Sequence, residues 1–531
     1  MAASASGRVI DRVELLSVLA LVGAAAWLGW RTLTRLGAAW AFVTDDAYIT
    51  LRYARHLLAG EGLVWNVGDA PVEGYSNFLY VLIAAVVGAL EQVDQIDIVP
   101  LRLLGCAGLF MTGYLQWAIA RRFVRGLPAL LPFAIYTLTR GALWWSVSGL
   151  ETSVYGALAC AVVLASLRGL GYGRVELAAD EHIGVARGPL APRWFALAGG
   201  LCVAASLLRP EGPLLALVVV AVALGQRALD GPSEAAAYRR AASSFALACG
   251  PALAIYFAWR WAYFGDLLPN TVRCKTGHAD RYQLLRDYWQ AAPLGLVAAL
   301  IHPLRELDAR VLLPIAVAGA YALALIGADP IVAHDLRHFL AAHALVCVLA
   351  SVAVVRIANL ITAADPRRVE LVLVAGLLLL AEPLGELPSR EDLRGRAASY
   401  QARSELRAKL GRHLARELGP GERAVLGDVG VAGWVADRPI LDGFCLNEPA
   451  LAKPPLRGSS EAAAGWILDQ APTLIVVHTR SKTSLDPRGA VYRALVDDPR
   501  FVDGWREQRR FNAAGGQFHY VVFRRADAAD L

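Results

Sequence analysis

The chain has 531 residues, of which 56% are hydrophobic and only 18% are charged, and its mean hydropathy is +0.44. This composition excludes an ordinary soluble protein of this size and is typical of a multi-span membrane protein. The formal net charge of +6 comes from short arginine clusters beside apolar segments, which indicates membrane orientation and not nucleic-acid binding.

The first apolar segment, 14–35, follows Arg8 and Arg12 and has the charge pattern of either a signal peptide or a first membrane span. It is long for a cleaved signal, and no small-residue cleavage site follows Trp30, so we expect an uncleaved span. The apolar run 78–90 is too short to cross, because a crossing helix needs about 20 residues. We expect it to dip into the bilayer.

The remaining apolar segments predict a bundle of about eleven transmembrane helices. The expected spans are 14–35, 99–120, 127–147, 152–168, 193–209, 212–226, 244–264, 286–304, 310–327, 339–357 and 369–385. With a cytoplasmic N-terminus, this arrangement places every short arginine-rich loop inside, as the positive-inside rule requires. The first loop, 37–98, and everything after the last span then lie outside. The alternative is an even count with a cytoplasmic C-terminal region, which requires one weak span to be dropped.

The character of the sequence changes after the last span. In residues 386–531 charged residues are frequent, and short apolar runs such as 473–477 alternate with helical stretches such as 391–417. This pattern predicts a soluble α/β domain, which we expect to shape an acceptor site or bind glycan. The expected organisation is a transmembrane domain, 1–385, in a bacterial inner membrane, followed by an extracytoplasmic domain, 386–531. No glycine-rich nucleotide fingerprint supports a cytosolic nucleotide-sugar site.

Two of the seven cysteines, Cys274 and Cys445, fall in polar segments, whereas the others lie in apolar runs. Their spacing matches no metal-binding motif, so we expect neither a metal nor another cofactor. A disulfide between these two cysteines is one option.

The segment 44–58, just after the first span, carries the most chemistry. Asp45 and Arg52 are seven residues apart, so a helix presents them on one face. An apolar stripe on the same helix predicts that it lies on the membrane surface. One interpretation is a catalytic base, Asp45 or Asp46, beside a cation that binds a phosphate. The other is that the acidic residues only cap the helix and offset its dipole.

Further candidates are polar residues that fall in loops assigned to the outer face. The expected phosphate-binding cations are Arg52, Arg273, Lys275 and Arg337, because guanidinium and ammonium groups hold phosphate well. The expected pocket residues are Tyr48, Glu73, Tyr75, Asn77, Glu151, Asn270, Asp329 and His338. Arg209 and Glu211, between two spans, are better explained as an interfacial ion pair.

These groups suit transfer of a sugar from a polyprenyl phosphate. The phosphate is already a good leaving group, so the protein has only to deprotonate an acceptor hydroxyl and neutralise the departing charge. One carboxylate and one or two cations are enough, and a single displacement inverts the anomeric carbon.

Three strings in the first loop, 45–55, 60–66 and 72–77, together resemble the signature of GT-C membrane glycosyltransferases related to the mycobacterial terminal arabinofuranosyltransferase. Weaker matches lie at 148–152, 209–212, 265–271, 427–430 and 442–447. The resemblance implies a GT-C fold, a polyprenyl-phosphate sugar donor with arabinofuranose as one candidate sugar, and a cell-envelope glycan or lipid acceptor. It also implies a base from the acidic pair. We favour Asp45, because it shares a helix face with Arg52.

The late outer loop departs from the family pattern. Related proteins often carry Gly-Gly-Asp before an Arg-Phe pair, whereas this chain has Gly327-Ala328-Asp329 and then Arg337-His338-Phe339. The roles of Asp329 and Arg337 therefore stay open. A non-enzymatic membrane protein, either a polyprenyl-sugar flippase or an assembly factor, is the alternative function. A flippase needs polar groups at the midplane and on both faces, whereas this chain concentrates them on one.

Overall fold

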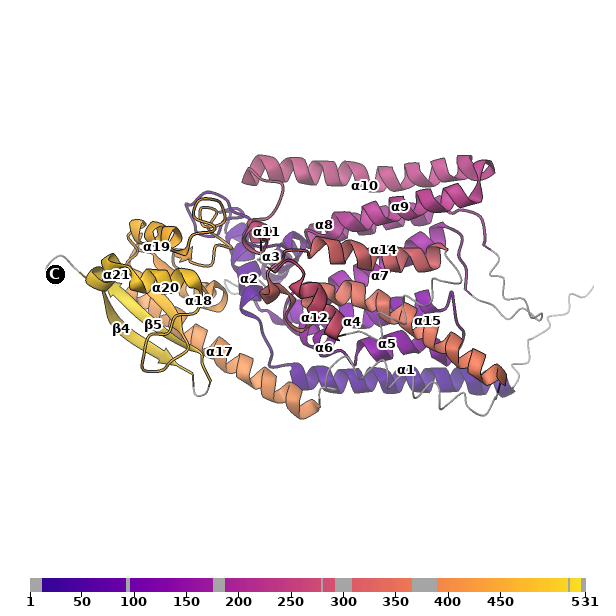
Figure 1. The fold of residues 1–531 in the computed structure, drawn as a ribbon, viewed down its shortest axis with the longest axis horizontal. Helices are drawn as coiled ribbons and strands as arrows, with labels where there is room; N and C mark the ends of the chain where they lie inside the picture. The colour runs from indigo at the N-terminus through magenta and orange to yellow at the C-terminus, as the bar shows by residue number, and fades with distance from the viewer. Residues whose placement is uncertain are drawn as a thin grey trace, which may run out of the picture.

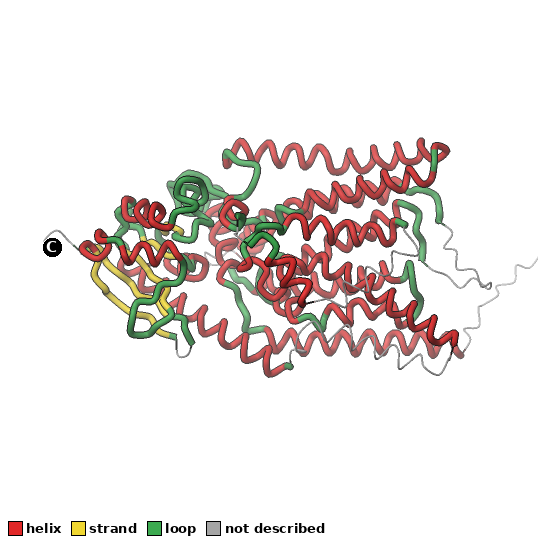
Figure 2. The backbone as a smooth tube through the Cα atoms, in the orientation of Figure 1, coloured by secondary structure: helices red, strands yellow, loops and turns green. Residues whose placement is uncertain are grey.

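A computed structural model describes residues 12–91, 96–174, 187–277, 280–291, 308–364, 389–513 and 516–526. A bundle of helices that run side by side forms the larger part of the molecule, and a small domain sits at one end of it (Figure 1). Within these ranges the strands are confined to the small domain, and many of the loops gather where it meets the bundle (Figure 2).

The bundle is built from α1 (Arg12–Ala39), α4 (Val99–Ala120), α7 (Thr152–Gly169), α8 (Pro192–Leu208), α9 (Gly212–Asp230), η2 (Pro232–Glu234), α10 (Ala235–Phe264), α14 (Ala309–Ala324) and α15 (Leu340–Ala364). Among the described residues, five helices are long and apolar enough to cross a membrane. Large apolar side chains on the outside of the bundle are well exposed, including Leu217 on α9 (64%) and Trp261 on α10 (65%), as lipid-facing groups should be. The chain is a multi-pass membrane protein.

The predicted span 127–147 is divided into η1 (Leu127–Leu130), α5 (Leu131–Tyr136) and α6 (Arg140–Ser146). A break in a membrane helix leaves backbone groups without helical partners, which must be satisfied by other parts of the protein. Here Arg35 of α1 donates to the carbonyl of Thr137 (3.2 Å). The Thr139 hydroxyl bonds His343 of α15 (3.1 Å). Contacts from distant helices therefore stabilise the break.

Other predicted spans are only partly represented. The spans 193–209 and 310–327 correspond to α8 and α14, which have 17 and 16 residues. The span 286–304 overlaps the end of α12 (Gln283–Ala291) and otherwise lies outside the described residues, as does all of 369–385. The count of eleven therefore stays a prediction.

Three short helices lie near the junction of the bundle and the small domain (Figure 1): α2 (Asp45–Leu58), α3 (Phe78–Glu91) and α11 (Asn270–Cys274). The short helix η4 (Pro330–Phe339) packs against α6, α12 and α15. With 14 residues, α3 spans about 21 Å at 1.5 Å per residue, less than the hydrocarbon core. The apolar stripe of α2 was expected to face the membrane. Instead, Ala47, Leu51 and Ala54 are fully buried in the protein core.

The C-terminal domain begins with a long helix and has the predicted α/β character. Its elements are α17 (Arg390–Glu417), β1 (Ala424–Leu426), α18 (Val429–Ala436), β2 (Ile440–Asp442), α19 (Ser460–Asp469), β3 (Leu474–Thr479), α20 (Ala490–Asp497), α21 (Pro499–Gly504), β4 (Trp505–Asn512) and β5 (His519–Arg525). The strands form one sheet in the order β2-β1-β3-β5-β4. The pairs β1–β2 and β1–β3 are parallel, and β3–β5 and β4–β5 are antiparallel.

Both faces of the sheet are covered by apolar cores. Alternate residues of a strand point to opposite sides, so neighbouring residues of β3 enter different cores. Leu474 and Val476 of β3 join a hydrophobic core that is continuous, through α17 and α18, with the core of the helix bundle. Ile475 and Val477 instead pack with α19 and α20 in a separate core. One face of the sheet therefore shares its core with the bundle, and α18 of the domain packs against α2.

Candidate active site

A polar cavity lies where α2, α11, η4 and the start of α7 meet, and its empty space, including the part that is open to solvent, is about 340 Å³. Its lining residues are Asp46, Ile49, Thr50, Gly74, Tyr75, Ser76, Asn77, Leu150, Glu151, Thr271, Lys275, Arg337 and Leu446. Asp46 lies in the first turn of α2, and its side chain is 43% exposed. Arg337 of η4 donates to its carboxylate at 3.3 Å.

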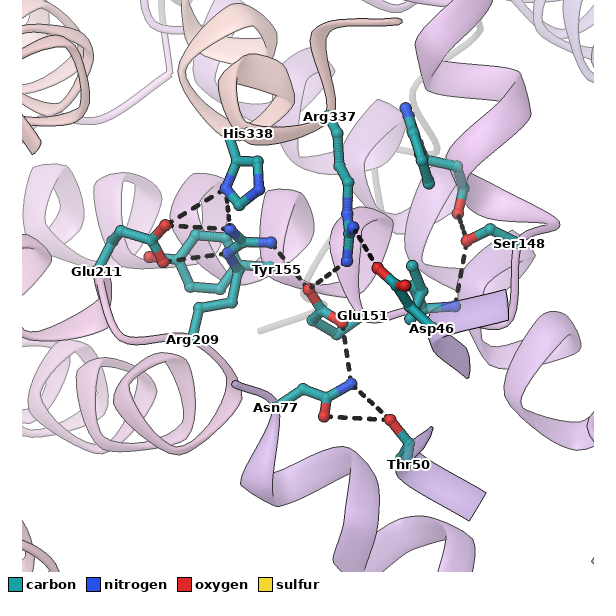
Figure 3. A network of polar contacts seen from close by, with 12 residues as sticks. Asp46, Thr50, Asn77, Ser148, Glu151, Tyr155, Arg209, Glu211, Arg337 and His338 are labelled. Carbon is teal, nitrogen blue, oxygen red and sulfur yellow. Dashed lines mark hydrogen bonds and ion pairs between the residues drawn. The ribbon is translucent and has the colours of Figure 1, made fainter. Parts of the chain in front are cut away.

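Arg337 is the first member of a chain of alternating charges (Figure 3). It lies 3.9 Å from the buried carboxylate of Glu151, which also pairs with Arg209 at 2.8 Å. Asn77 donates to the other oxygen of Glu151 (3.1 Å), and its amide is held by Thr50. Every oxygen of Glu151 therefore has a partner, which suits a positioning role for this carboxylate.

The chain ends in the ion pair that was expected between two spans. Arg209 and Glu211 are 3.0 Å apart, and His338 contacts both of them (Figure 3). Burial would raise the pKa of Glu211, but Arg209 and His338 outweigh it and hold that pKa well below its usual range. Glu211 is therefore an ionised anchor for Arg209.

Lys275 is a cation of the polar cavity that is available to bind a ligand. It follows α11, is half-buried and lines the polar cavity, and its side chain has no ion pair or hydrogen bond within the part of the chain that the structure describes. Burial lowers its pKa, and the nearby Asp46 opposes that effect. For Asp46, burial would raise the pKa, but Lys275 and Arg337 prevail and lower it. The cavity thus contains an ionised carboxylate beside two cations.

A second, larger cavity adjoins the first, and its empty space, again including the part that is open to solvent, is about 910 Å³. The two share Ser76, Thr271, Lys275 and Arg337. The walls of the larger cavity are more apolar, with Leu214 from α9 and Leu325 at the end of α14, and His338 also lines it. Lys275 and Arg337 therefore stand at the boundary between a polar and an apolar space. An amphiphile with an anionic group between its two parts fits such a boundary.

Two buried hydroxyl groups of the polar cavity are unpaired among the described residues. They are the phenol of Tyr75 and the hydroxyl of Thr271, whose residues are 3% and 5% exposed. Both oxygen atoms have almost no accessible surface, so they do not face the open space of the cavity.

Asp45, the expected base, faces away from the cavity. Its carboxylate accepts hydrogen bonds from the backbone N–H groups of Gly430 (3.0 Å) and Val431 (2.8 Å) in the first turn of α18. Arg407 of α17 lies 3.4 Å from the same carboxylate. Asp45 therefore caps a helix of the C-terminal domain and not its own helix.

Arg52 shares this face with Asp45, as the spacing predicts, but it is 2% exposed and faces protein acceptors. Its guanidinium donates to the carbonyls of Trp65 (2.9 Å), Gly433 (2.6 Å) and Arg438 (2.9 Å) and to the side chain of Asn66 (3.2 Å). This arrangement leaves little capacity for a donor phosphate and makes Arg52 a link between the first loop and the C-terminal domain.

The remaining predicted residues divide into two groups. Tyr75, Asn77, Glu151, Lys275 and Arg337 join Asp46 at the polar cavity, and His338 lines the apolar one. Tyr48, Glu73, Asn270, Arg273 and Asp329 line neither cavity, nor do Asp45 and Arg52.

Several residues of the second group have structural partners. Glu73 pairs with Arg260 of α10 at 2.6 Å, and burial raises its pKa to about 7 although Arg260 opposes the shift. Arg273 pairs with Asp266 at 2.6 Å. The backbone N–H of Asp329 donates to the carbonyl of Lys275 (2.9 Å). Tyr48 is half-buried and packs against the core.

Sequence reasoning missed Thr50, Ser76, Thr271 and Leu446 as cavity residues. Ser76 and Thr271 lie inside strings that resemble family motifs, and Thr50 is one helical turn after Asp46, so a signal existed for these three. Leu446 comes from the C-terminal domain, and nothing in the sequence connects it to the first loop.

A disulfide joins Cys274, next to Lys275, to Cys445 of the C-terminal domain. Asn270, at the other end of α11, donates to the carbonyls of Cys445 (2.7 Å) and Leu446 (3.0 Å). The segment that carries Lys275 is therefore fixed to the domain at both ends. Within the described residues, no group of three or more His, Cys, Asp or Glu side chains is arranged to hold a metal ion.

Comparison with solved structures shows the fold. ArnT from Cupriavidus metallidurans bound to undecaprenyl phosphate superposes with a TM-score of 0.51 at 14% identity, over 94% of this chain and 98% of ArnT. The oligosaccharyltransferase of Archaeoglobus fulgidus in its apo form gives a TM-score of 0.55 at 11% identity, over 92% of this chain and 80% of that one. The same archaeal protein, in complex with an inhibitory peptide and a dolichol-phosphate, gives 0.54 at 11% identity over the same shares.

These similarities confirm the predicted GT-C fold with a small C-terminal α/β domain. Residues 393–523, which form most of that domain, match a family model described as a domain of unknown function (DUF8728). No curated protein matches the chain in sequence.

Proposed function

We propose that this chain is an inverting glycosyltransferase that moves a sugar from a polyprenyl-phosphate donor to a hydroxyl group of a cell-envelope glycan or lipid. The observation that carries the proposal is the meeting of Asp46, Lys275 and Arg337 where the polar and apolar cavities join. A polyprenyl-phosphate sugar has the matching order of parts, with a polar sugar, an anionic phosphate and an apolar tail. The similar ArnT structure contains undecaprenyl phosphate, a lipid of the same class.

The groups present can perform a single displacement. Asp46 accepts the proton of the acceptor hydroxyl while the oxygen of that hydroxyl attacks the anomeric carbon. The bond between that carbon and the phosphate oxygen breaks, and its electron pair leaves with the polyprenyl phosphate. Lys275 and Arg337 neutralise the charge that develops on the leaving phosphate. The new bond forms opposite the old one, so the configuration at the anomeric carbon inverts.

Asp46 is a better candidate for the base than Asp45. The carboxylate of Asp46 is open to the cavity, whereas that of Asp45 is engaged by two backbone N–H groups and Arg407. A base must reach the proton that it abstracts, so accessibility decides between two adjacent residues of equal chemistry.

We place this chemistry on the extracytoplasmic face of a bacterial inner membrane. The Cys274–Cys445 disulfide, next to the site, supports an oxidising compartment. Arginines of the expected cytoplasmic loops gather at the other end of the bundle, where Arg310 donates to the carbonyl of Arg122 (3.2 Å). This distribution supports a cytoplasmic N-terminus under the positive-inside rule.

The sugar and the acceptor are defined only by class. Arabinofuranose is one candidate sugar. Leu446 brings the C-terminal domain to the cavity wall, which supports a contribution of that domain to the acceptor site. Deletion of residues 386–531 with full activity on a polymeric acceptor would contradict this contribution.

The proposal is tested with membranes that contain the full chain and a panel of radiolabelled polyprenyl-phosphate pentoses and hexoses. Thin-layer separation should show label leaving one donor and appearing in a larger product, and Asp46→Asn should abolish that transfer. If the wild-type chain transfers no label from any donor but moves labelled lipid between leaflets, the flippase alternative replaces the enzyme.

A further inference from the structure

The face of α2 opposite the cavity makes a dense polar contact with α18 of the C-terminal domain. The first N–H groups of a helix have no partner within that helix and need a cap. In α18 the N-cap residue, Asp428, does not supply this cap with its own side chain. The carboxylate of Asp45 does so instead, by accepting from Gly430 and Val431.

The side chain of Asp428 is occupied elsewhere. It accepts from the hydroxyl of Tyr520 (2.5 Å) and lies 3.3 Å from both Arg407 and His478. Arg407 in turn lies 3.4 Å from Asp45, so one guanidinium of α17 joins the two carboxylates. The domain therefore presents an N–H pair and a cation, both directed at Asp45.

The other end of α18 is held by the same helix face. Arg52 donates to the carbonyl of Gly433 (2.6 Å), and Arg55 pairs with Asp437 (2.7 Å) and lies over the ring of Trp434. A carboxylate at the N-terminus and a guanidinium at the C-terminus of α18 both match the helix dipole. This charge pattern allows α2 and α18 to dock in one direction and one register.

The backbones of α18 and α2 approach each other closely at Gly430. A Cβ atom at this position would overlap the backbone carbonyl of Asp45. Because Asp46 is the next residue along α2, a shift of Asp45 moves the Asp46 carboxylate with respect to Lys275 and Arg337. Lys275 follows α11 and Arg337 lies in η4, so neither cation moves together with α2.

We propose that the C-terminal domain is a positioning element for the active site, and that Asp45 is the positioning residue through which α18 sets the location of Asp46. This inference rests on the proposed function for its catalytic consequence. It assigns to the domain of unknown function a role as an intramolecular clamp on α2. The clamp itself is a structural contact that can be tested without turnover.

The test compares Asp45→Asn, Gly430→Ala and the double variant in the full chain. The control is Gly504→Ala, in the same domain, where an added Cβ meets open space. Each single variant should lower kcat by about 10- to 100-fold, because a displacement of about 1 Å at a reacting group has that effect. The dissociation constant of undecaprenyl phosphate, used as the probe, should change by less than about twofold, because the cations are held separately.

Two further readouts separate positioning from chemistry. The double variant should lose no more than the more damaging single variant, because both changes break one contact. The acidic limb of the pH dependence of kcat/KM should persist in Asp45→Asn, because the base is Asp46. If that limb disappears while Gly430→Ala keeps wild-type kcat, Asp45 is the base and the inference is wrong. Wild-type kcat in both variants also overturns it.

Hydrogen exchange of the peptide that covers residues 44–50 decides whether the clamp exists. Exchange should rise in Gly430→Ala and Asp45→Asn and stay unchanged in Gly504→Ala. Unchanged exchange in all three refutes the clamp, whatever the chain catalyses. If the wild-type chain transfers no sugar from any donor, the proposed function fails and this exchange experiment still tests the contact.

Discussion

The first turn of α2 has a carboxylate and a nearby cation on each of two sides, and the two sides differ in how fully these groups are paired. On the domain side, Asp45 accepts two backbone hydrogen bonds of 3.0 and 2.8 Å and faces Arg407. On the cavity side, Asp46 has one long contact with Arg337 at 3.3 Å, and Lys275 is unpaired within the described residues. Buried polar networks that are complete stabilise one structure, whereas incomplete ones leave groups for a ligand. Of these two adjacent residues, Asp45 therefore has a structural role and Asp46 is the one available for chemistry.

The largest expected effect comes from removing the charge on the cavity side. Asp46→Asn should lower kcat by about 10²- to 10⁴-fold, the usual contribution of a general base. Undecaprenyl phosphate should bind at least as tightly as to the wild type, because the change removes a negative charge beside Lys275 and Arg337. Turnover of labelled donor and equilibrium binding of undecaprenyl phosphate measure the two quantities separately.

The matched control for that experiment is Asp469→Asn, which removes an exposed carboxylate from α19 of the C-terminal domain. Asp469 pairs with Arg500 at 2.8 Å and its side chain is 64% exposed, so its loss should leave kcat near the wild-type value. Equal losses from Asp46→Asn and Asp469→Asn would contradict the assignment of Asp46 as the base.

The next largest effect concerns the unpaired cation. Lys275→Met keeps most of the side-chain volume and should weaken binding of undecaprenyl phosphate by about 10- to 100-fold, because hydrogen bonds to charged groups contribute about 1.5–3 kcal/mol. Arg273→Met is the control, since Arg273 is two residues away, pairs with Asp266 and lines neither cavity. Titration of undecaprenyl phosphate gives both dissociation constants. Similar losses in the two variants would indicate a general effect of positive charge in this segment.

Much of the fold follows from local sequence, because apolar length is a local property. The predicted spans 99–120, 152–168 and 212–226 correspond to α4, α7 and α9, with ends that differ by a few residues at most. The break in 127–147 could not be predicted in this way. Arg35 donates to the backbone carbonyl of Thr137, His343 bonds the hydroxyl of Thr139, and both partners are distant in the sequence. Partners of that kind leave no periodic signal.

The candidate site shows the same limit. Polarity in outer loops was enough to select Asp46, Glu151, Lys275 and Arg337, which meet at one cavity. Helical spacing also correctly placed Asp45 and Arg52 on one face. Spacing does not reveal what that face contacts, and the partner of Asp45 is Gly430, 385 residues away. The preference for Asp45 as the base depended on that missing partner.

A smaller effect is expected from the disulfide that fixes the segment with Lys275. Replacing Cys274 and Cys445 together by serine should raise the KM for donor by about 3- to 5-fold, because Lys275 becomes more mobile while Asn270 still holds α11. Loss of a native disulfide typically costs about 2–4 kcal/mol of stability, so the thermal midpoint should fall as well. Cys106→Ser, at a free cysteine in α4, is the control. A reductant should reproduce the change in wild type and have no effect on the double variant.

The smallest effect is a shift in pH dependence. In the free protein, burial alone would raise the pKa of Asp46, but Lys275 and Arg337 lower it, so the base stays ionised to acidic pH. A bound donor phosphate neutralises both cations and adds negative charge, which must raise the pKa of Asp46. The rate falls when the base is protonated, so the acidic limb of kcat, which reports the complex, should lie at higher pH than that of kcat/KM, which reports the free protein. Initial rates at saturating and at low donor should be measured from about pH 3, below the ordinary pKa of an aspartate, up to about pH 7, so that the two limbs can be compared. Coincident limbs would mean that the cations do not bind the phosphate. Lys275→Met should raise the pKa of Asp46 in the free protein, which brings the limb of kcat/KM closer to the limb of kcat.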